Sequence, residues 1–151
     1  PVGVREAPPG GGMLKRPASP ALGMDEISLG VPAGVLDSLP EQDGTAAQDL
    51  QRAVAGIERS LNDAIAEADD EAEAVAIVAD AVETMEDNAE EYNEFVPELR
   101  AWGQSPIYAI AWRNLYVELL AQLNEVEWIA DGLDRERTYR QFEDGIRFGQ
   151  D

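Results

Sequence analysis

Five acidic residues lie within about three turns of a predicted helix, and carboxylates at this spacing could bind a cation. Carboxylate oxygens are the ligands that Ca²⁺ and Mg²⁺ prefer. Helical bundles with di-metal centres usually add Glu-x-x-His motifs, however, and the sequence has no histidine. Residues 58–98 hold fifteen acidic residues against Arg59 alone, so we interpret this stretch as a solvated face and predict no metal site. The five residues are Glu83, Asp87, Glu90, Glu91 and Glu94.

The sequence lacks the side chains that most often carry out covalent and acid–base catalysis. It has no cysteine, which removes thiolate nucleophiles, thiolate metal ligands and disulfides. The absence of histidine removes the most common general base. No glycine-rich phosphate loop or nucleophile motif occurs in it either. We therefore predict no catalytic residue, no cofactor and no enzymatic activity.

The chain is strongly acidic, with 31 acidic against 11 basic residues and a formal net charge of −20. Ten of the basic residues are arginine. This acid-rich, lysine-poor balance resembles proteins of halophilic archaea, in which molar salt screens the repulsion between carboxylates. The alternative is an acidic protein from an ordinary source. In either case the phosphates of a nucleic acid would be repelled, so we predict no direct binding of nucleic acid.

Residues 105–132 predict the central helix of the fold, because apolar residues recur there at spacings of three and four. Ser105 and Pro106 suit a helix start, and Gly132 suits a left-handed residue after the helix end. The apolar stripe is broad, so we expect other elements to cover the helix over much of its circumference, with Trp112 as an anchor. The recurring positions are Tyr108, Trp112, Leu115, Leu119, Leu123, Val126, Ala130 and Leu133.

Residues 46–93 show the same periodicity and predict a helix of roughly 70 Å at about 1.5 Å per residue. Small residues on its apolar stripe suit the close approach of another helix. Residues 69–71, Asp-Asp-Glu, are the one place where an aspartate could cap a second helix. We favour a single long helix over two.

The two long helical stretches are expected to pack as an antiparallel hairpin of residues 45–96 and 105–131. Pro97 should end, kink or restart the first helix, because proline lacks an N–H group and clashes with the preceding turn. A short helical segment is expected near residues 97–102, and Gly103 then allows the chain to reverse.

Residues 1–44 predict an extended arm, since they hold seven of the nine prolines and eight of the thirteen glycines. Apolar residues alternate over residues 27–31 and could form one strand on the sheet edge of a partner chain. The alternative, which composition alone favours, is a disordered tail. The arm residues expected to contact a partner are Ile27, Leu29, Val31, Val35 and Leu36.

The C-terminal residues combine arginine with aromatic side chains, a composition enriched at protein interfaces. Asp134 could cap a short third helix that runs from Arg135 to about Ile146. The arginines could equally pair with the acidic first helix of the same chain. The residues expected to contact a partner here, together with Trp128, are Arg135, Arg137, Tyr139, Arg140, Phe142, Ile146 and Phe148.

These elements predict an all-α protein with an extended docking arm over residues 1–44 and a helical domain over residues 45–151. The domain is a long antiparallel hairpin with a short C-terminal third helix. The longest uncharged run in the helical part is too short to span a bilayer, and no signal-peptide pattern is visible. We therefore expect no membrane span and an intracellular, cytoplasmic or virion location.

An extended arm joined to a hairpin with surplus apolar surface favours a non-enzymatic structural or assembly protein of a multi-subunit complex. By analogy, the acidic composition points to a virion component of a halophilic archaeal virus, either capsid-associated or connecting head and tail. Its partners would be its own copies or other subunits of the assembly. The alternative is a cellular helical adaptor or regulator that binds one protein partner through the surface of residues 105–148.

Overall fold

The computed structural model describes residues 24, 26–40 and 44–133. Within this part of the chain there are five α-helices and no strand, which confirms the all-α prediction. No helix among the described residues is long and apolar enough to cross a membrane. The helices are α1 (Ala33–Asp37), α2 (Gly44–Ala66), α3 (Glu71–Ala101), α4 (Ile107–Asn124) and α5 (Glu127–Gly132).

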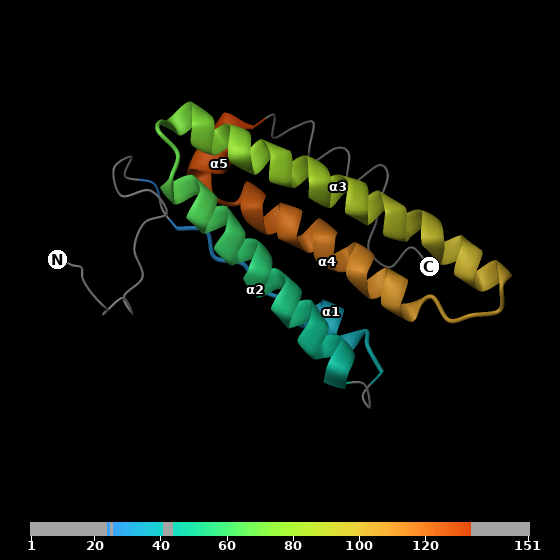
Figure 1. Cartoon of the computed structure of the whole chain (residues 1–151). Helices are drawn as coiled ribbons and strands as arrows, with labels where there is room; N and C mark the ends of the chain where they lie inside the picture. Colours follow the sequence, from blue (N-terminus) through green and yellow to red (C-terminus); the bar gives the residue numbers. More distant parts are fainter. Residues whose placement is uncertain (1–23, 25, 41–43, 134–151) are drawn as a thin grey trace.

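The predicted antiparallel hairpin is present, and its two helices are α3 and α4 (Figure 1). α2 runs antiparallel to α3 and packs against both α3 and α4, so the three long helices enclose one core. The short α5 returns to the start of α3. This arrangement agrees with the expectation that other elements surround the helix after residue 105.

The predicted single helix over residues 46–93 is wrong, because the chain reverses between α2 and α3. Asp70 caps α3: its side chain accepts a hydrogen bond from the Glu73 N–H at 2.8 Å. The Glu73 carboxylate in turn accepts one from the Asp69 N–H at 3.1 Å. These bonds satisfy N–H groups that have no partner inside the helix. The reversal allows the apolar faces of α2 and α3 to share one core.

The end of α3 lies one turn later than the sequence suggested. Pro97 lies inside α3, so the separate segment expected near residues 97–102 is the last turn of this helix. Gly103 has a φ of 76°, as a left-handed residue after a helix end requires. Its N–H bonds to Arg100 O at 3.0 Å, and the next N–H bonds to Leu99 O at 2.8 Å. This pair of bonds is the Schellman motif, which here opens the turn into α4.

The helix predicted over residues 105–132 is interrupted at residues 125–126, where α4 gives way to α5. Gly132 is part of α5 and does not have a positive φ, so its predicted role as a left-handed residue is wrong. A Cβ placed on Gly132 would lie 2.6 Å from Cγ2 of Val75. Glycine is therefore needed here because α5 approaches α3 closely.

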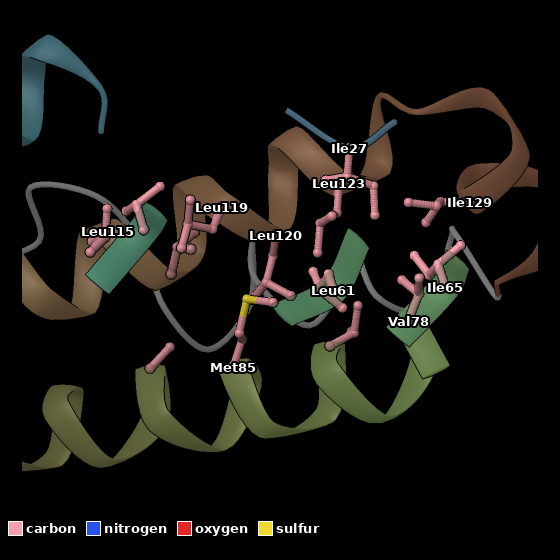
Figure 2. Close-up of a cluster of buried hydrophobic side chains, with 14 of the residues drawn as sticks. Ile27, Leu61, Ile65, Val78, Met85, Leu115, Leu119, Leu120, Leu123 and Ile129 are labelled. Carbon is pink, nitrogen blue, oxygen red and sulfur yellow. The ribbon is translucent and has the colours of Figure 1, made fainter. Parts of the chain in front are cut away.

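One hydrophobic core joins the arm and helices α2 to α5 (Figure 2). α4 contributes most to it and is buried around most of its circumference, as predicted. Trp112, which was expected to be a buried anchor, is only half-buried at the edge of this core. The largest fully buried apolar side chains are Ile27, Leu50, Ile65, Val78, Leu115, Leu119, Leu120, Leu123 and Ile129.

The described part of the expected arm, residues 26–40, lies against α2 and α4 of its own chain. Residues 26–32 are extended but form no strand. Instead, side chains supply the hydrogen bonds that a neighbouring strand would supply. The amide of Asn62 on α2 bonds to both backbone groups of Ile27, and the amide of Gln122 on α4 does the same for Gly30.

Candidate protein-binding groove

An open groove of about 620 Å³ lies between α2 and α3 at the edge of the core. Most of the side chains that line it are small or apolar, and we call it the α2/α3 groove. From α2 it is lined by Ala53, Gly56, Ile57, Ser60, Leu61 and Ala64, from α3 by Ile77, Ala81, Thr84, Met85 and Asn88, and from α4 by Tyr116.

The helical repeat explains how the sequence builds this groove. On each helix a second line of residues, spaced by three or four, runs beside the stripe that enters the core. On α2 this line is made of small side chains. At Gly56 a Cβ would have no neighbour within 4 Å. The groove is therefore open enough at this point for the backbone of another element to approach.

A second hollow of about 490 Å³ adjoins the groove, and we call it the acidic–aromatic pocket. It shares Asn88 and Tyr116 with the groove, so the two form one continuous surface along α3. One end of this surface is thus largely apolar, and the other combines carboxylates with aromatic rings. The pocket is lined by Asn88, Glu91, Tyr92, Glu94, Phe95, Glu98 and Tyr116.

Ring contacts hold the aromatic side chains of the pocket in place. Tyr92 stacks on Trp112 and on Tyr116, with centroid distances of 6.2 Å in both pairs. Phe95 meets Trp102 edge-on at 6.3 Å, and these two side chains are 39% and 61% exposed. Fixed ring faces next to carboxylates form a suitable site for a cationic side chain, and arginine is the side chain that uses both features best.

Tyr116 lines both the groove and the pocket. Burial raises the pKa of Tyr116, and the neighbouring Tyr92 adds to the increase. A hydrogen bond with Asn88 acts in the opposite direction. A neutral phenol can donate a hydrogen bond to a ligand without adding negative charge.

The arm residues that were expected to contact another chain face their own helices. Ile27 and Val35 are buried, with exposures of 0% and 4%. Leu29, Val31 and Leu36 are half-buried or exposed in part and pack against the same core, as does Trp128 of α5. The other predicted contact residues, Arg135, Arg137, Tyr139, Arg140, Phe142, Ile146 and Phe148, lie outside the described residues.

The five carboxylates considered for a cation site are all exposed on α3. Among the described residues no group of three or more aspartate, glutamate, histidine or cysteine side chains could hold a metal ion. Glu91 and Glu94 do have a place in the surface, because they line the acidic–aromatic pocket. Their position there suits a cationic side chain of a partner.

Sequence reasoning missed the α2/α3 groove and the burial of Arg113. Arg113 is 1% exposed, and its guanidinium donates hydrogen bonds to Asn93 and Asn114, each at 3.0 Å. The signal for Arg113 was a single basic residue within an apolar helix. The signal for the groove was the line of small residues beside the main stripe of α2. This line indicates a groove only when it is known that α2 folds back on α3.

Residues 24–150 match the model of a family described as a family of unknown function (DUF7971). The matched region begins at the first described residue and includes residues 24–44 of the arm, all five helices and most of the C-terminal residues. No curated protein and no solved structure matches the chain.

Proposed function

The chain belongs to this family of unknown function, and we propose that it is a non-enzymatic assembly protein that binds a helix of another subunit in the α2/α3 groove. The observation that carries the proposal is the open groove itself, with small and apolar side chains along both walls. Exposed apolar surface of this kind is characteristic of interaction sites. No helix among the described residues covers it.

The shape of the groove favours a helix as the bound element. The walls are two helices, and a third helix laid between them can place its side-chain ridges between theirs. From Ala53 to Ala64 the α2 wall is about 17 Å long at about 1.5 Å per residue, which is three helical turns. Recognition of an amphipathic helix in an apolar groove is a recurrent mode of protein binding.

The charge of the surface favours a basic partner helix. At the pocket end Glu91, Glu94 and Glu98 meet Tyr92 and Phe95. An arginine or lysine just beyond the apolar face of the bound helix would find carboxylates and ring faces there. We therefore propose an amphipathic helix with an apolar face and a cationic residue at one end.

The composition supports a further part of the proposal, that the assembly forms in high salt. Two copies with a formal charge of −20 repel each other strongly at low ionic strength. In about 1 M salt the screening length falls to about 3 Å, so the copies can approach. A particle of a haloarchaeal virus, as proposed from the sequence, would provide such conditions.

A cellular adaptor that binds one protein partner is the second candidate. It is favoured by the position of residues 26–40, which pack on α2 and α4 of the same chain. An assembly subunit that linked its neighbours by this arm would need these residues elsewhere. The adaptor would form a discrete complex through the same groove, without large self-assemblies.

Sedimentation velocity on the full chain from about 10 mM to about 2 M salt tests the proposal, because screening varies widely over this range. We expect a defined oligomer whose share of the protein increases with the salt concentration. Thr84→Glu, at an exposed position in the groove, should dissociate it. Ala76→Glu adds the same charge at an exposed position of α3 outside the groove and should not.

Circular dichroism on the same samples must show equal helix content in both variants. A folded monomer at every salt concentration would contradict the assembly role. Equal behaviour of the two variants would contradict the groove as the binding surface.

A further inference from the structure

We infer that the helix bound in the α2/α3 groove is residues 134–148 of a second copy of this chain. The inference rests on the proposed function and adds the identity of the partner. Residues 134–148 lie outside the described residues, and their sequence complements the shape and charge of the groove.

The apolar residues of the segment match the groove in size and spacing. Tyr139, Phe142 and Ile146 are separated by three and four positions, which places them on one face of a helix. Large side chains on this face complement the small ones of the groove walls, such as Gly56 and Ala81. A helix of fifteen residues is about 22 Å long, which spans the α2 wall and extends beyond it into the pocket.

The arginines near the two ends of the segment suit the acidic–aromatic pocket. Residues 134–148 hold four of the ten arginines in the chain beside four acidic residues, so the match depends on the position of single arginines and not on net charge. Arg135 and Arg147 flank the apolar face, so an arginine reaches the pocket whichever way the helix runs along the groove. There it would meet the carboxylates of Glu91, Glu94 and Glu98 and the adjoining aromatic rings.

The point at which the chain leaves α5 favours the groove of a second copy over its own. Gly132 lies against Val75, so the segment starts on the side of α3 where Val75 points. Ile77, on the groove wall, is about 200° further around the helix at about 100° per residue. To enter its own groove the segment would first have to cross the outer face of α3, whereas a second copy presents its groove without this obstacle.

Exchange of the segment between two copies would close a symmetric dimer, and one-way insertion would give an open chain of subunits. Either form buries the apolar groove together with the aromatic side chains of the segment. Both forms place arginines next to acidic side chains of a neighbour, which lowers the repulsion between highly acidic subunits.

Site-directed cross-linking of full chains tests the inference. The sequence contains no cysteine, so each introduced thiol is unique. One chain carries Thr84→Cys or Ser60→Cys, on opposite walls of the groove and both exposed. The other carries Thr138→Cys, four residues before Phe142 on the same predicted helix face. The two are mixed in molar salt and treated with a short bismaleimide.

We expect a covalent dimer in which mass spectrometry links residue 138 to residue 84 or 60. The matched control carries Ala76→Cys, an exposed position of α3 outside the groove. Its yield with Thr138→Cys should be about tenfold lower. Equal yields from the control, or no link at either groove position, would overturn the inference.

A chain that carries both Thr84→Cys and Thr138→Cys tests whether the groove binds the segment of its own chain instead. At high dilution, a link formed within one monomer would show that the segment enters its own groove, which also overturns the inference. A second experiment uses Phe142→Ser. This substitution should lower the association constant of the assembly by at least about tenfold. If Thr84→Glu dissolves the assembly but Phe142→Ser does not, the groove binds another element: the inference fails and the proposed function stands.

Discussion

The side-chain amide of Asn62 replaces a neighbouring β-strand for the backbone of Ile27. Its Oδ1 accepts a hydrogen bond from the Ile27 N–H at 2.9 Å, and its Nδ2 donates one to the Ile27 carbonyl at 2.8 Å. Gln122 repeats the arrangement on Gly30, at 3.0 and 2.9 Å. Buried or half-buried backbone groups must be paired, and in an all-α protein these amides let an extended segment enter the core without a sheet.

Replacing Asn62 should loosen the arm. We expect Asn62→Ala to lower the free energy of unfolding by about 1–3 kcal/mol, because both backbone groups of Ile27 lose their partner. Asn62→Asp keeps the oxygen that accepts from the Ile27 N–H and loses the N–H that donates to the Ile27 carbonyl. Urea titrations followed by circular dichroism measure the change, with the exposed Asp63→Ala on the same helix as control. Equal stability of the two alanine variants would mean that the amide does not hold the arm.

The contact between Gly132 and Val75 predicts a coupled pair of substitutions. Gly132→Ala should cost about 1–3 kcal/mol, since its Cβ would lie 2.6 Å from Cγ2 of Val75. In the background of Val75→Ala the same change should cost much less, because the clashing methyl groups are absent. A double-mutant cycle of unfolding free energies measures this coupling. Additive costs would show that α5 does not pack against α3 at this point.

A substitution at Gly56 should change the stability of the monomer and the strength of self-association in opposite directions. Gly56→Ala has open space for its Cβ in the middle of α2, so we expect the monomer to gain about 0.5–1 kcal/mol. The same methyl group narrows the α2/α3 groove and should weaken self-association. Thermal unfolding at low salt and sedimentation at high salt report the two effects. A variant that is more stable and associates as well as the parent would argue against close packing of a partner at this position.

Glu118 should make stability fall with rising pH. Burial raises the pKa of Glu118, and the nearby Glu125 adds to the increase. The folded state therefore binds the proton more tightly than the unfolded state. The protonated form contributes its full stability below the unfolded pKa of about 4.3. This contribution is lost as the pH rises from there through the raised folded value.

Glu118→Gln should remove this part of the pH dependence and raise stability at neutral pH. Urea titrations across the acidic range measure the slope. The exposed Glu83→Gln on α3 is the control, as it removes the same charge from a solvated position. An unchanged slope in Glu118→Gln would show that this carboxyl group does not titrate differently in the folded protein.

The periodic apolar pattern determined which segments are helical and which faces enter the core. Leu115, Leu119 and Leu123 recur at the helical repeat, and all three are fully buried. The turn at Gly103 was equally local, because only a residue that accepts a positive φ closes the helix in this way. Such features depend on neighbours in the chain, so the sequence alone was enough to predict them.

The tertiary structure decided the features that depend on contacts between distant residues. From the sequence, a break before α3 was one of two alternatives. In the structure, Asp70 caps α3 and α2 packs back on the hairpin, and both features require the break. The role of Gly132 depends on Val75, which is far away in the sequence. Ile27 enters the core because Asn62 pairs its backbone, and the α2/α3 groove exists because α2 folds back beside α3. A local pattern carries no information about which distant surface will meet it.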